Sequence, residues 1–560
     1  MNKRTRIIIL LACISLIVLG VAVLMRRSTL PDPRPLVPIH ADLYIELASL
    51  EQLGPAIERL SSEAGVPLSL PYLAHVLSPD LLRPMKFPGS TGFDATRPLG
   101  IVASFPPGSL PLVVGFFPVR DRSALTEELG LPSGSLGLRA VAIKGMYVAY
   151  ERGYLLVSLD ARTIEDLFVL REKGVDLPAR DPGTLATAYA LPHLLYLARS
   201  LLSYAPEDAS AAGRIPPLLL GKALDVIRSI RMEVRDDAGL SVTTHIELPG
   251  DNPLLKALSP AGGHPPLLDL LPAAAFIGGL RVEPGPAQRL KEEELEILRP
   301  LVTDSATLHA IRARVQHVSG EYAGAVLRWD HFSADASNAV WMEAIPPGRE
   351  EEFDAHTERV HHAATGLWQT LLQDSGDSRI TMNGEDLAPE TYRGVVVNGV
   401  RIRTKLPIEP PLFADANFRR HLGKLTNRAS TYRYGRVTVP PDSRAFMITT
   451  TGLDPSVMKS QIDLLLAPRD SPSRMERRAA NDTAILRAVR ALPQDVAGYC
   501  LIDPFLLAGR DSTAAHYFGL SVRGVEAGIE IDLVLPREHL RGIALKFLSH
   551  TGPRPAAPKI

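Results

Sequence analysis

The feature that most constrains the fold is an internal repeat of strand and helix patterns. One series follows residue 38 and returns in the same order from about residue 270. The first series opens with Pro38 and the segment LYIEL, and the second opens with Pro272 and AAFIGGLRV. LVVGFF, which ends at Phe117, corresponds to AVWMEAI, which ends at Ile345. Recurrence at such a distance is typical of duplicated structural units.

Later segments of the two series also correspond. MYVAY and YLLVSL, joined by residues 151–153, predict a β-hairpin, and Asp160 predicts the N-cap of the helix TIEDLFVL. In the second series GRVTV and AFMITTT stand in these places, and Asp454 with Pro455 precedes the helical segment VMKSQIDLLL. LATAYALPHLL around Tyr189 matches VAGYCLIDPFLL around Tyr499.

The strands that close each series alternate apolar and polar residues. Residues 240–248 place leucine, valine and isoleucine against serine, histidine and glutamate, and residues 529–535 do the same with Glu530 and Asp532. A period of two indicates half-buried strands of antiparallel sheet. We therefore expect an α+β fold with two related lobes of antiparallel sheet packed with helices, over residues 39–262 and 263–550. The second lobe is longer, and polar stretches at 330–337, 374–391 and 414–431 predict insertions or loops.

The N-terminal segment predicts a membrane anchor. Residues 7–25 form nineteen residues without a charge, which as a helix would span roughly 28 Å, close to the hydrocarbon core of a bilayer. Basic residues precede it at Lys3, Arg4 and Arg6 and follow it at Arg26 and Arg27. We expect a cytoplasmic tail at 1–6, a transmembrane helix at 7–25, a proline-rich spacer at 26–38 and a flexible tail at 551–560.

Two other interpretations of this segment stay open. Gly20 and Ala22 have the mutual spacing of a signal-peptide cleavage site, although the apolar run continues beyond them. The sequence LLAC, ending at Cys13, is similar to a degenerate lipidation box. An uncleaved anchor predicts a single-pass protein of the bacterial inner membrane with its C-terminal domain in the periplasm.

Composition narrows the function. Lys and Arg number 61 against 62 Asp and Glu, for a formal net charge of -1, so no global field attracts nucleic acid. Cys13 lies in the apolar segment, so Cys500 is the single thiol of the expected ectodomain and an intramolecular disulfide framework is excluded. Aromatic residues make up 6% and tryptophan occurs three times, which predicts no stacking platform.

Motifs of catalysis are largely missing. The chain has no phosphate-binding GxxxxGK[ST], no HExxH, no GxSxG and no CxxC pair. Ser456 and Lys459 match the SxxK pattern of serine acylases, but that pattern has two fixed positions and its companion motifs do not follow. Asp94 and Arg97 in GFDATRPLG predict a turn in which Asp94 accepts backbone hydrogen bonds.

Histidines give no metal-site pattern. His356, His361 and His362 are five and six residues apart in a predicted helix, whereas chelation from one helical face needs spacings of three or four. We therefore assign no catalytic, cofactor-binding or metal-ligating residue and expect no cofactor.

Several segments of the sequence resemble a known family, which bears on where the protein is located in the cell. The succession of an LYIEL-like strand, GFDATRPLGIV, FFPVRDRSAL and YVAYERGYLLVSLDARTIEDL resembles an uncharacterised bacterial domain-of-unknown-function family. Its members look like membrane-anchored or exported envelope (periplasmic) proteins with duplicated α+β units. The resemblance implies an envelope location and an α+β character, and it transfers no catalytic residue.

Three functional hypotheses follow. The first is a noncatalytic, membrane-tethered envelope scaffold or binding protein whose partner is another envelope protein or component. The second is an envelope hydrolase that uses Ser456, Lys459 or a pair of carboxylates. The third is a carrier of an apolar ligand, indicated by leucine-rich segments such as PPLLLGKAL.

Overall fold

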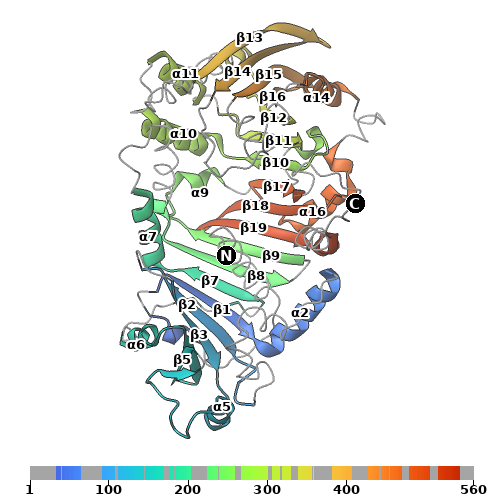
Figure 1. Ribbon diagram of the computed structural model, residues 1–560. Helices are drawn as coiled ribbons and strands as arrows, with labels where there is room; N and C mark the ends of the chain where they lie inside the picture. Colours follow the sequence, from blue (N-terminus) through green and yellow to red (C-terminus); the bar gives the residue numbers. More distant parts are fainter. Residues whose placement is uncertain are drawn as a thin grey trace, which may run out of the picture. The chain divides into compact units, whose positions relative to one another are not determined.

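Antiparallel β-structure is the main element of the computed structural model (Figure 1). The structure describes residues 33–38, 41–64, 91–106, 111–143, 145–169, 177–178, 180–181, 183–203, 224–236, 239–258, 267–299, 305–315, 318–328, 338–355, 357, 381–405, 427–440, 443–452, 454–468, 478–504 and 515–542. By internal contacts the chain divides into two compact units. The first comprises residues 1–198, 227–247 and 534–560, and the second comprises residues 199–226 and 248–533.

The first unit is a sheet flanked by short helices. Its strands are β1 (Leu43–Ser49), β2 (Pro98–Ser104), β3 (Leu112–Pro118), β4 (Val141–Ile143), β5 (Met146–Glu151), β6 (Tyr154–Ser158), β7 (Ala186–Ala190), β8 (Ser229–Asp236) and β9 (Gly239–Glu247). Its helices are η1 (Arg34–Leu36), α2 (Leu50–Ala64), α5 (Arg122–Glu128), α6 (Ala161–Val169) and most of α7 (Pro192–Ser203).

Strand β1 is central in this unit. It pairs with β2 and with β7, and both pairings are antiparallel. Further antiparallel pairs give the strand order β4-β5-β6-β3-β2-β1-β7-β8-β9. Helix α2 packs on one face, because Leu53, Ile57 and Leu60 repeat at helical spacing and join a buried cluster with Val234. Complete burial of such side chains stabilises the unit by about 1.5–3 kcal/mol each.

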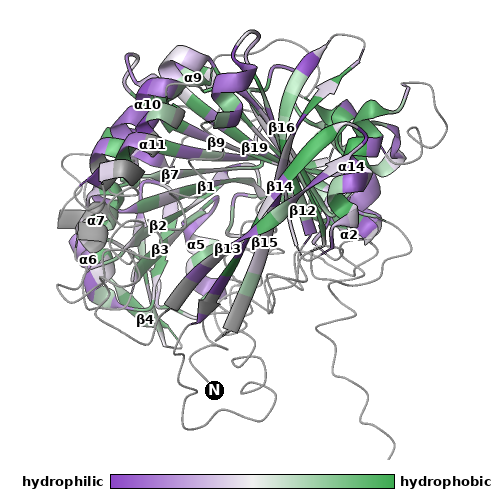
Figure 2. Cartoon of the chain, turned by 90° about the horizontal axis from the view of Figure 1, so that it is seen from above, coloured by the Kyte–Doolittle hydropathy of each residue, from purple (hydrophilic) through white to green (hydrophobic). Residues whose placement is uncertain are grey.

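The second unit contains the longest strands. They are β10 (Phe276–Arg281), β11 (Glu321–Arg328), β12 (Asn338–Ala344), β13 (Thr381–Tyr392), β14 (Val395–Lys405), β15 (Asn427–Val439), β16 (Arg444–Thr451), β17 (Gly498–Ile502), β18 (Phe518–Val525) and most of β19 (Gly528–Pro536). The helices are α9 (Pro253–Ala257), η3 (Leu268–Leu270), α10 (Pro284–Leu298), α11 (Ser305–Val315), α14 (Ser456–Leu466), η6 (Ala479–Asn481) and α16 (Thr483–Ala491). Helix α10 is largely hydrophilic, whereas apolar residues concentrate in the strands (Figure 2).

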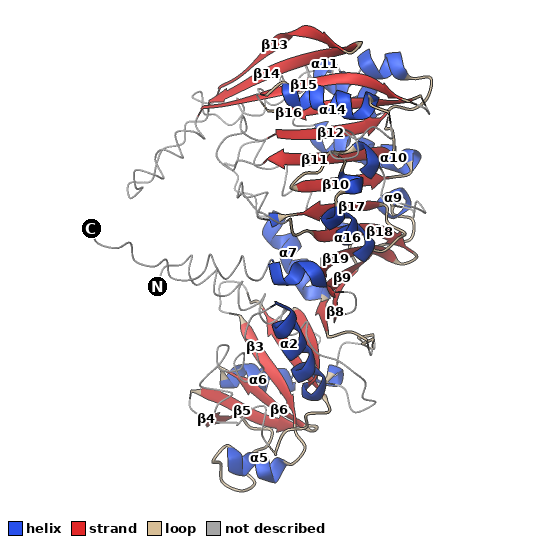
Figure 3. Ribbon diagram, turned by 90° about the vertical axis from the view of Figure 1, so that its right-hand side faces the viewer, coloured by secondary structure: helices blue, strands red, loops and turns tan. Residues whose placement is uncertain are grey.

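Here β10 is the central strand, between β11 and β17. Antiparallel pairs continue from β11 through β12, β16 and β15 to β14 and β13, and on the other side from β17 to β18. Figure 3 shows β10, β11, β12 and β16 lying side by side. Every second residue of β10 faces the core, where Ile277 is completely buried.

The predicted fold class, an N-terminal transmembrane helix followed by two related α+β lobes packed with helices, is wrong. The nineteen strands of the described residues are antiparallel, and most of the helices beside them are short. Among these residues no helix combines the length and apolar character needed to cross a bilayer. The predicted anchor at residues 7–25 lies outside the described part of the chain. Alternating segments identify strands, but they do not show which strands pair, so the predicted arrangement of lobes did not follow from them.

The prediction of loops in the second unit is also partly wrong. Residues 381–391, predicted as a polar insertion, form most of β13, and residues 427–431 belong to β15. Backbone hydrogen bonds to β14 hold β13 in place although most of its side chains are exposed. A strand exposed on both faces lacks the apolar alternation by which sequence patterns identify strands. The remaining parts of the three insertions lie outside the described residues.

Local predictions from capping and turn residues are confirmed. β5 and β6 form a hairpin through Arg152 and Gly153, whose φ angles of 44° and 83° are those of a tight turn. Asp160 accepts hydrogen bonds from the backbone N–H groups of Arg162 and Thr163 at the start of α6. Asp94 likewise accepts from the backbone of Thr96.

Candidate functional site

A pair of glycines forms the floor of a pocket on the sheet of the second unit. Gly278 in β10 lies directly opposite Gly324 in β11, and Gly324 lies opposite Trp341 in β12. A Cβ atom at Gly324 would lie 2.3 Å from the indole ring of Trp341. The missing side chains therefore allow the indole to lie close to the strands and leave bare backbone beside it.

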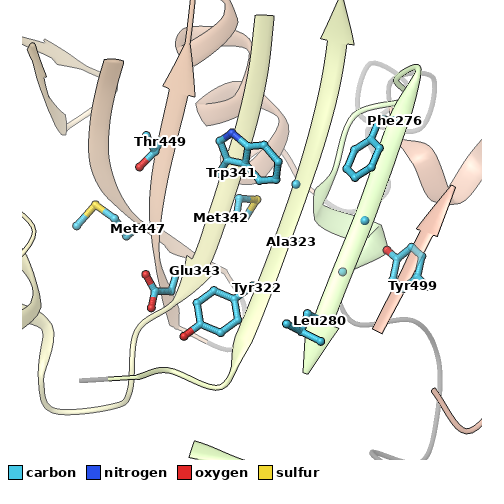
Figure 4. A pocket seen from close by; sticks show the side chains of 13 residues that line it. Phe276, Leu280, Tyr322, Ala323, Trp341, Met342, Glu343, Met447, Thr449 and Tyr499 are labelled. Carbon is cyan, nitrogen blue, oxygen red and sulfur yellow. The ribbon is translucent and has the colours of Figure 1, made fainter. Parts of the chain in front are cut away.

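Strand alternation decides which face of the sheet carries the pocket. Met342 points toward α14, because the side-chain amide Nε2 of Gln461 in that helix lies 3.3 Å from Met342 Sδ. Trp341 and Glu343 flank Met342 in β12, so their side chains point to the opposite face. Figure 4 shows Trp341 and Glu343 on the same side of β12, with the Tyr322 ring close to Glu343.

The pocket gathers aromatic residues from four strands. Its volume of about 390 Å³ falls within the range of roughly 300–1,000 Å³ typical of small-molecule sites. Trp341 is 45% exposed, so the aromatic wall is open to solvent. The lining residues are Phe276, Gly278, Gly279, Leu280, Tyr322, Ala323, Gly324, Trp341, Met342, Glu343, Met447, Thr449 and Tyr499.

The pocket is apolar with a single charge among its described lining residues. Glu343 is half-buried and lies directly opposite Tyr322 of β11. Thr449 and the Tyr322 hydroxyl add groups that can form hydrogen bonds. Such a combination of aromatic walls and a few polar groups can bind and orient a small apolar molecule.

Cys500 lies next to the pocket floor, because it pairs with Gly278 across β17 and β10. Burial raises the pKa of its thiol to about 12. Since the thiolate is the nucleophilic form, this thiol stays protonated and unreactive at neutral pH. Burial also raises the pKa of the neighbouring Tyr499 hydroxyl well above its usual range.

The SxxK residues are separate from this pocket. Ser456 is exposed at the start of α14, where its backbone N–H donates to Asp454. Lys459 pairs with Glu390 of β13, and its Nζ lies 5.5 Å from the centre of the Tyr392 ring. The described contacts of Ser456 and Lys459 are therefore with Asp454, Glu390 and Tyr392, outside the pocket.

Of the other residues considered from the sequence, Arg97 has a structural role, and three histidines lie outside the described residues. Arg97 is buried, and its guanidinium lies 4.5 Å from the centre of the Tyr154 ring and donates to the Gly153 carbonyl. Arg97 therefore stabilises the first unit by joining the Asp94 turn to the β5–β6 hairpin.

His356, His361 and His362 lie outside the described residues.

The first unit contains a cluster of buried carboxylates and arginines. Glu233 in β8 pairs with Arg231 at 3.1 Å and with Arg235 at 2.7 Å, and Glu46 in β1 pairs with Arg180 at 2.9 Å. Burial opposes ionisation of Glu233, but the hydrogen bonds and positive charges around it outweigh burial and lower its pKa to about 2. Both carboxylates are matched by arginines within the unit, which makes this cluster a structural feature.

Sequence patterns missed the pocket because its parts come from separate segments. The low aromatic content predicted no stacking platform, yet Phe276, Tyr322 and Trp341 line one hollow. The one local signal was the adjacent Gly278 and Gly279 in AAFIGGLRV, since glycine inside a strand often marks a place where another group approaches the backbone closely. Only strand register shows that Gly278 meets a second glycine, Gly324, and then a tryptophan.

Comparison with known proteins supplies no relative for this chain. It matches no protein-family model, no curated protein and no solved structure. The pocket and its chemistry therefore carry the functional argument.

Proposed function

We propose that this protein is a noncatalytic binding protein whose ligand is a small, largely apolar molecule held in the pocket between β10, β11 and β12. The observation that supports the proposal most directly is the bare floor at Gly278 and Gly324 beside the half-exposed ring of Trp341. Larger side chains in place of Gly278 and Gly324 would bury more apolar surface than glycine does. Keeping glycine there beside an exposed tryptophan therefore costs stability. Ligand binding would recover that lost burial.

The proposal of a noncatalytic role rests on the groups beside the pocket. Cys500 is held in its protonated form, and Ser456 and Lys459 are engaged elsewhere. An envelope location, and an envelope component as the natural ligand, stay predictions from the sequence. Fractionation of cells that produce the full chain, followed by immunodetection, tests the location.

Binding can be tested with N-phenyl-1-naphthylamine, a neutral apolar dye whose fluorescence rises when it leaves water. We expect the full chain to enhance the dye's fluorescence in a saturable manner. Gly278→Leu places a side chain on the pocket floor and is expected to weaken dye binding at least tenfold, because the space for the ring is filled. Trp341→Ala removes one wall and is expected to weaken it about three- to tenfold.

The matched control is Tyr196→Ala, which removes an aromatic side chain that is 65% exposed on α7. It is expected to leave dye binding unchanged, and circular dichroism verifies that each variant remains folded. Equal dye binding by the wild type, Gly278→Leu and Trp341→Ala would place the dye elsewhere and overturn the proposal.

A further inference from the structure

The glycine on the pocket floor leaves a slot in strand β10. Phe276, Gly278 and Leu280 lie on the pocket face of this strand and are partly exposed, while the residues between them are buried. Successive side chains on one face of a strand stand about 6.6–6.8 Å apart, twice the rise per residue. Because Gly278 has no side chain, β10 does not fill the space between Phe276 and Leu280. We call this space the glycine slot.

Trp341 forms one side of the glycine slot. Its indole atoms Cε3 and Cζ3 lie over Gly324, the residue directly opposite Gly278. Adjacent strands are about 4.7–4.9 Å apart, so the indole lies one strand away from the slot. The residue is 45% exposed, and part of the ring surface is therefore open to a ligand.

Phe276 supplies a second ring beside the slot. A Cβ atom added to Gly278 would lie 3.4 Å from Phe276 Cε1 and 3.5 Å from Phe276 Cζ, which is close to van der Waals contact. The Phe276 ring therefore leans along β10 toward the slot, and Figure 4 shows it at the same end of the pocket as Trp341. A group that fills the slot would contact both rings.

Aromatic walls favour one kind of occupant. Two aromatic rings attract each other in offset-stacked or edge-to-face arrangements, and this attraction is worth roughly two- to tenfold in affinity beyond the burial of surface. A saturated ring with the same carbon skeleton lacks the charge distribution of a π-system and gains only burial. It is also thicker, because hydrogen atoms project from both of its faces, so it fits less well where one side chain is missing.

We infer that the ligand carries a flat aromatic ring, which enters the glycine slot and packs against Trp341 and Phe276. This inference rests on the proposed function and adds the shape of the ligand to it. The site would select unsaturated ring systems over alkyl chains and saturated rings of similar size.

The test compares two competitors that share one carbon skeleton. 2-Naphthalenemethanol has a flat ring system, and decahydro-2-naphthalenemethanol is its saturated counterpart. Each is used to displace N-phenyl-1-naphthylamine from the full chain, and the quantity measured is the ratio of their inhibition constants. The saturated alcohol has the larger apolar surface, so burial alone predicts that it binds more tightly. We expect instead that the wild type prefers the naphthyl alcohol by about threefold or more.

Three variants assign this preference to the aromatic wall. Trp341→Leu keeps an apolar wall without a π-face and is expected to reduce the preference for the naphthyl alcohol about threefold or more. Trp341→Phe keeps a ring and is expected to retain most of the preference. Tyr196→Leu removes an exposed ring that does not line the pocket, and it is expected to leave the ratio unchanged. Circular dichroism verifies that each variant is folded.

The outcomes separate the two proposals. If Gly278→Leu weakens dye binding but the wild type binds the saturated alcohol at least as tightly as the naphthyl alcohol, the inference about shape is overturned and the binding function stands. A preference that Trp341→Leu leaves unchanged would overturn the inference as well. If the dye is insensitive to Gly278→Leu, the binding function fails and the inference fails with it. A preference that falls with Trp341→Leu and returns with Trp341→Phe would support both.

Discussion

At the scale of single residues, the pocket depends on side chains that are missing. Gly324 has no Cβ, and that position is the one that the Trp341 ring occupies. Neither residue alone indicates a site, because glycine in a strand and a partly exposed tryptophan both have ordinary structural explanations. Their meaning comes from being direct neighbours across β11 and β12.

A methyl group at Gly324 should therefore displace the indole. Gly324→Ala is expected to lower the free energy of unfolding by about 1–3 kcal/mol, or less if the exposed ring rotates away. In either case the tryptophan emission spectrum and the near-ultraviolet circular dichroism should change. Gly250→Ala is the control, because nothing lies within 4 Å of its added Cβ. Unchanged spectra for Gly324→Ala would contradict the close contact of the ring with the strand.

At the scale of elements, turn and cap residues were the most predictable part of this chain. The β5–β6 hairpin and the N-cap of α6 follow from Gly153 and Asp160, whose local chemistry acts within a few residues. Strand β13 was mistaken for a loop, because its polar side chains gave no sign of the pairing with β14. A strand that is held by backbone pairing and exposes polar side chains therefore gives no pattern by which the sequence identifies it.

The turn of that hairpin gives an element-scale prediction. Gly153 has a φ of 83°, and a Cβ there would lie 2.9 Å from Arg97 Nη1. Gly153→Ala is expected to cost about 1–2 kcal/mol for the left-handed backbone alone, with an added cost for moving Arg97 from the Tyr154 ring.

Gly134→Ala separates these two contributions. Gly134 has a φ of 77°, but its added Cβ would meet nothing within 4 Å. Chemical denaturation of both variants should show the larger loss of stability for Gly153→Ala. Equal losses would mean that the Arg97 contact contributes nothing.

At the scale of the whole molecule, buried charge makes stability depend on pH. Glu233 is 2% exposed, and its pKa is lowered from the ordinary value of 4.5 to about 2 in the folded protein. A carboxyl group whose pKa is lower when folded stabilises the protein above its unfolded pKa. That contribution is lost as the pH falls from about 4.5 to about 2.

We expect this carboxylate to contribute about 3 kcal/mol at neutral pH, by the conversion of about 1.36 kcal/mol per pKa unit. Urea denaturation of the wild type from pH 7 to pH 2 should show a loss of stability in this window. Glu233→Gln should be less stable at pH 7 and should lose less on acidification. An identical dependence on pH in the two proteins would contradict the lowered pKa.

The sequence by itself determined the strands that alternate, the turns and the helix caps, because these depend on the chemistry of adjacent residues. It also supplied the expectation of an internal duplication and an envelope location, which stay predictions. Only the tertiary structure decided which strands pair within each unit and that Gly278, Gly324, Trp341 and Glu343 meet on one face. The physical reason is register: cross-strand neighbours are set by backbone pairing between distant segments, and no local pattern encodes which residue will lie opposite which.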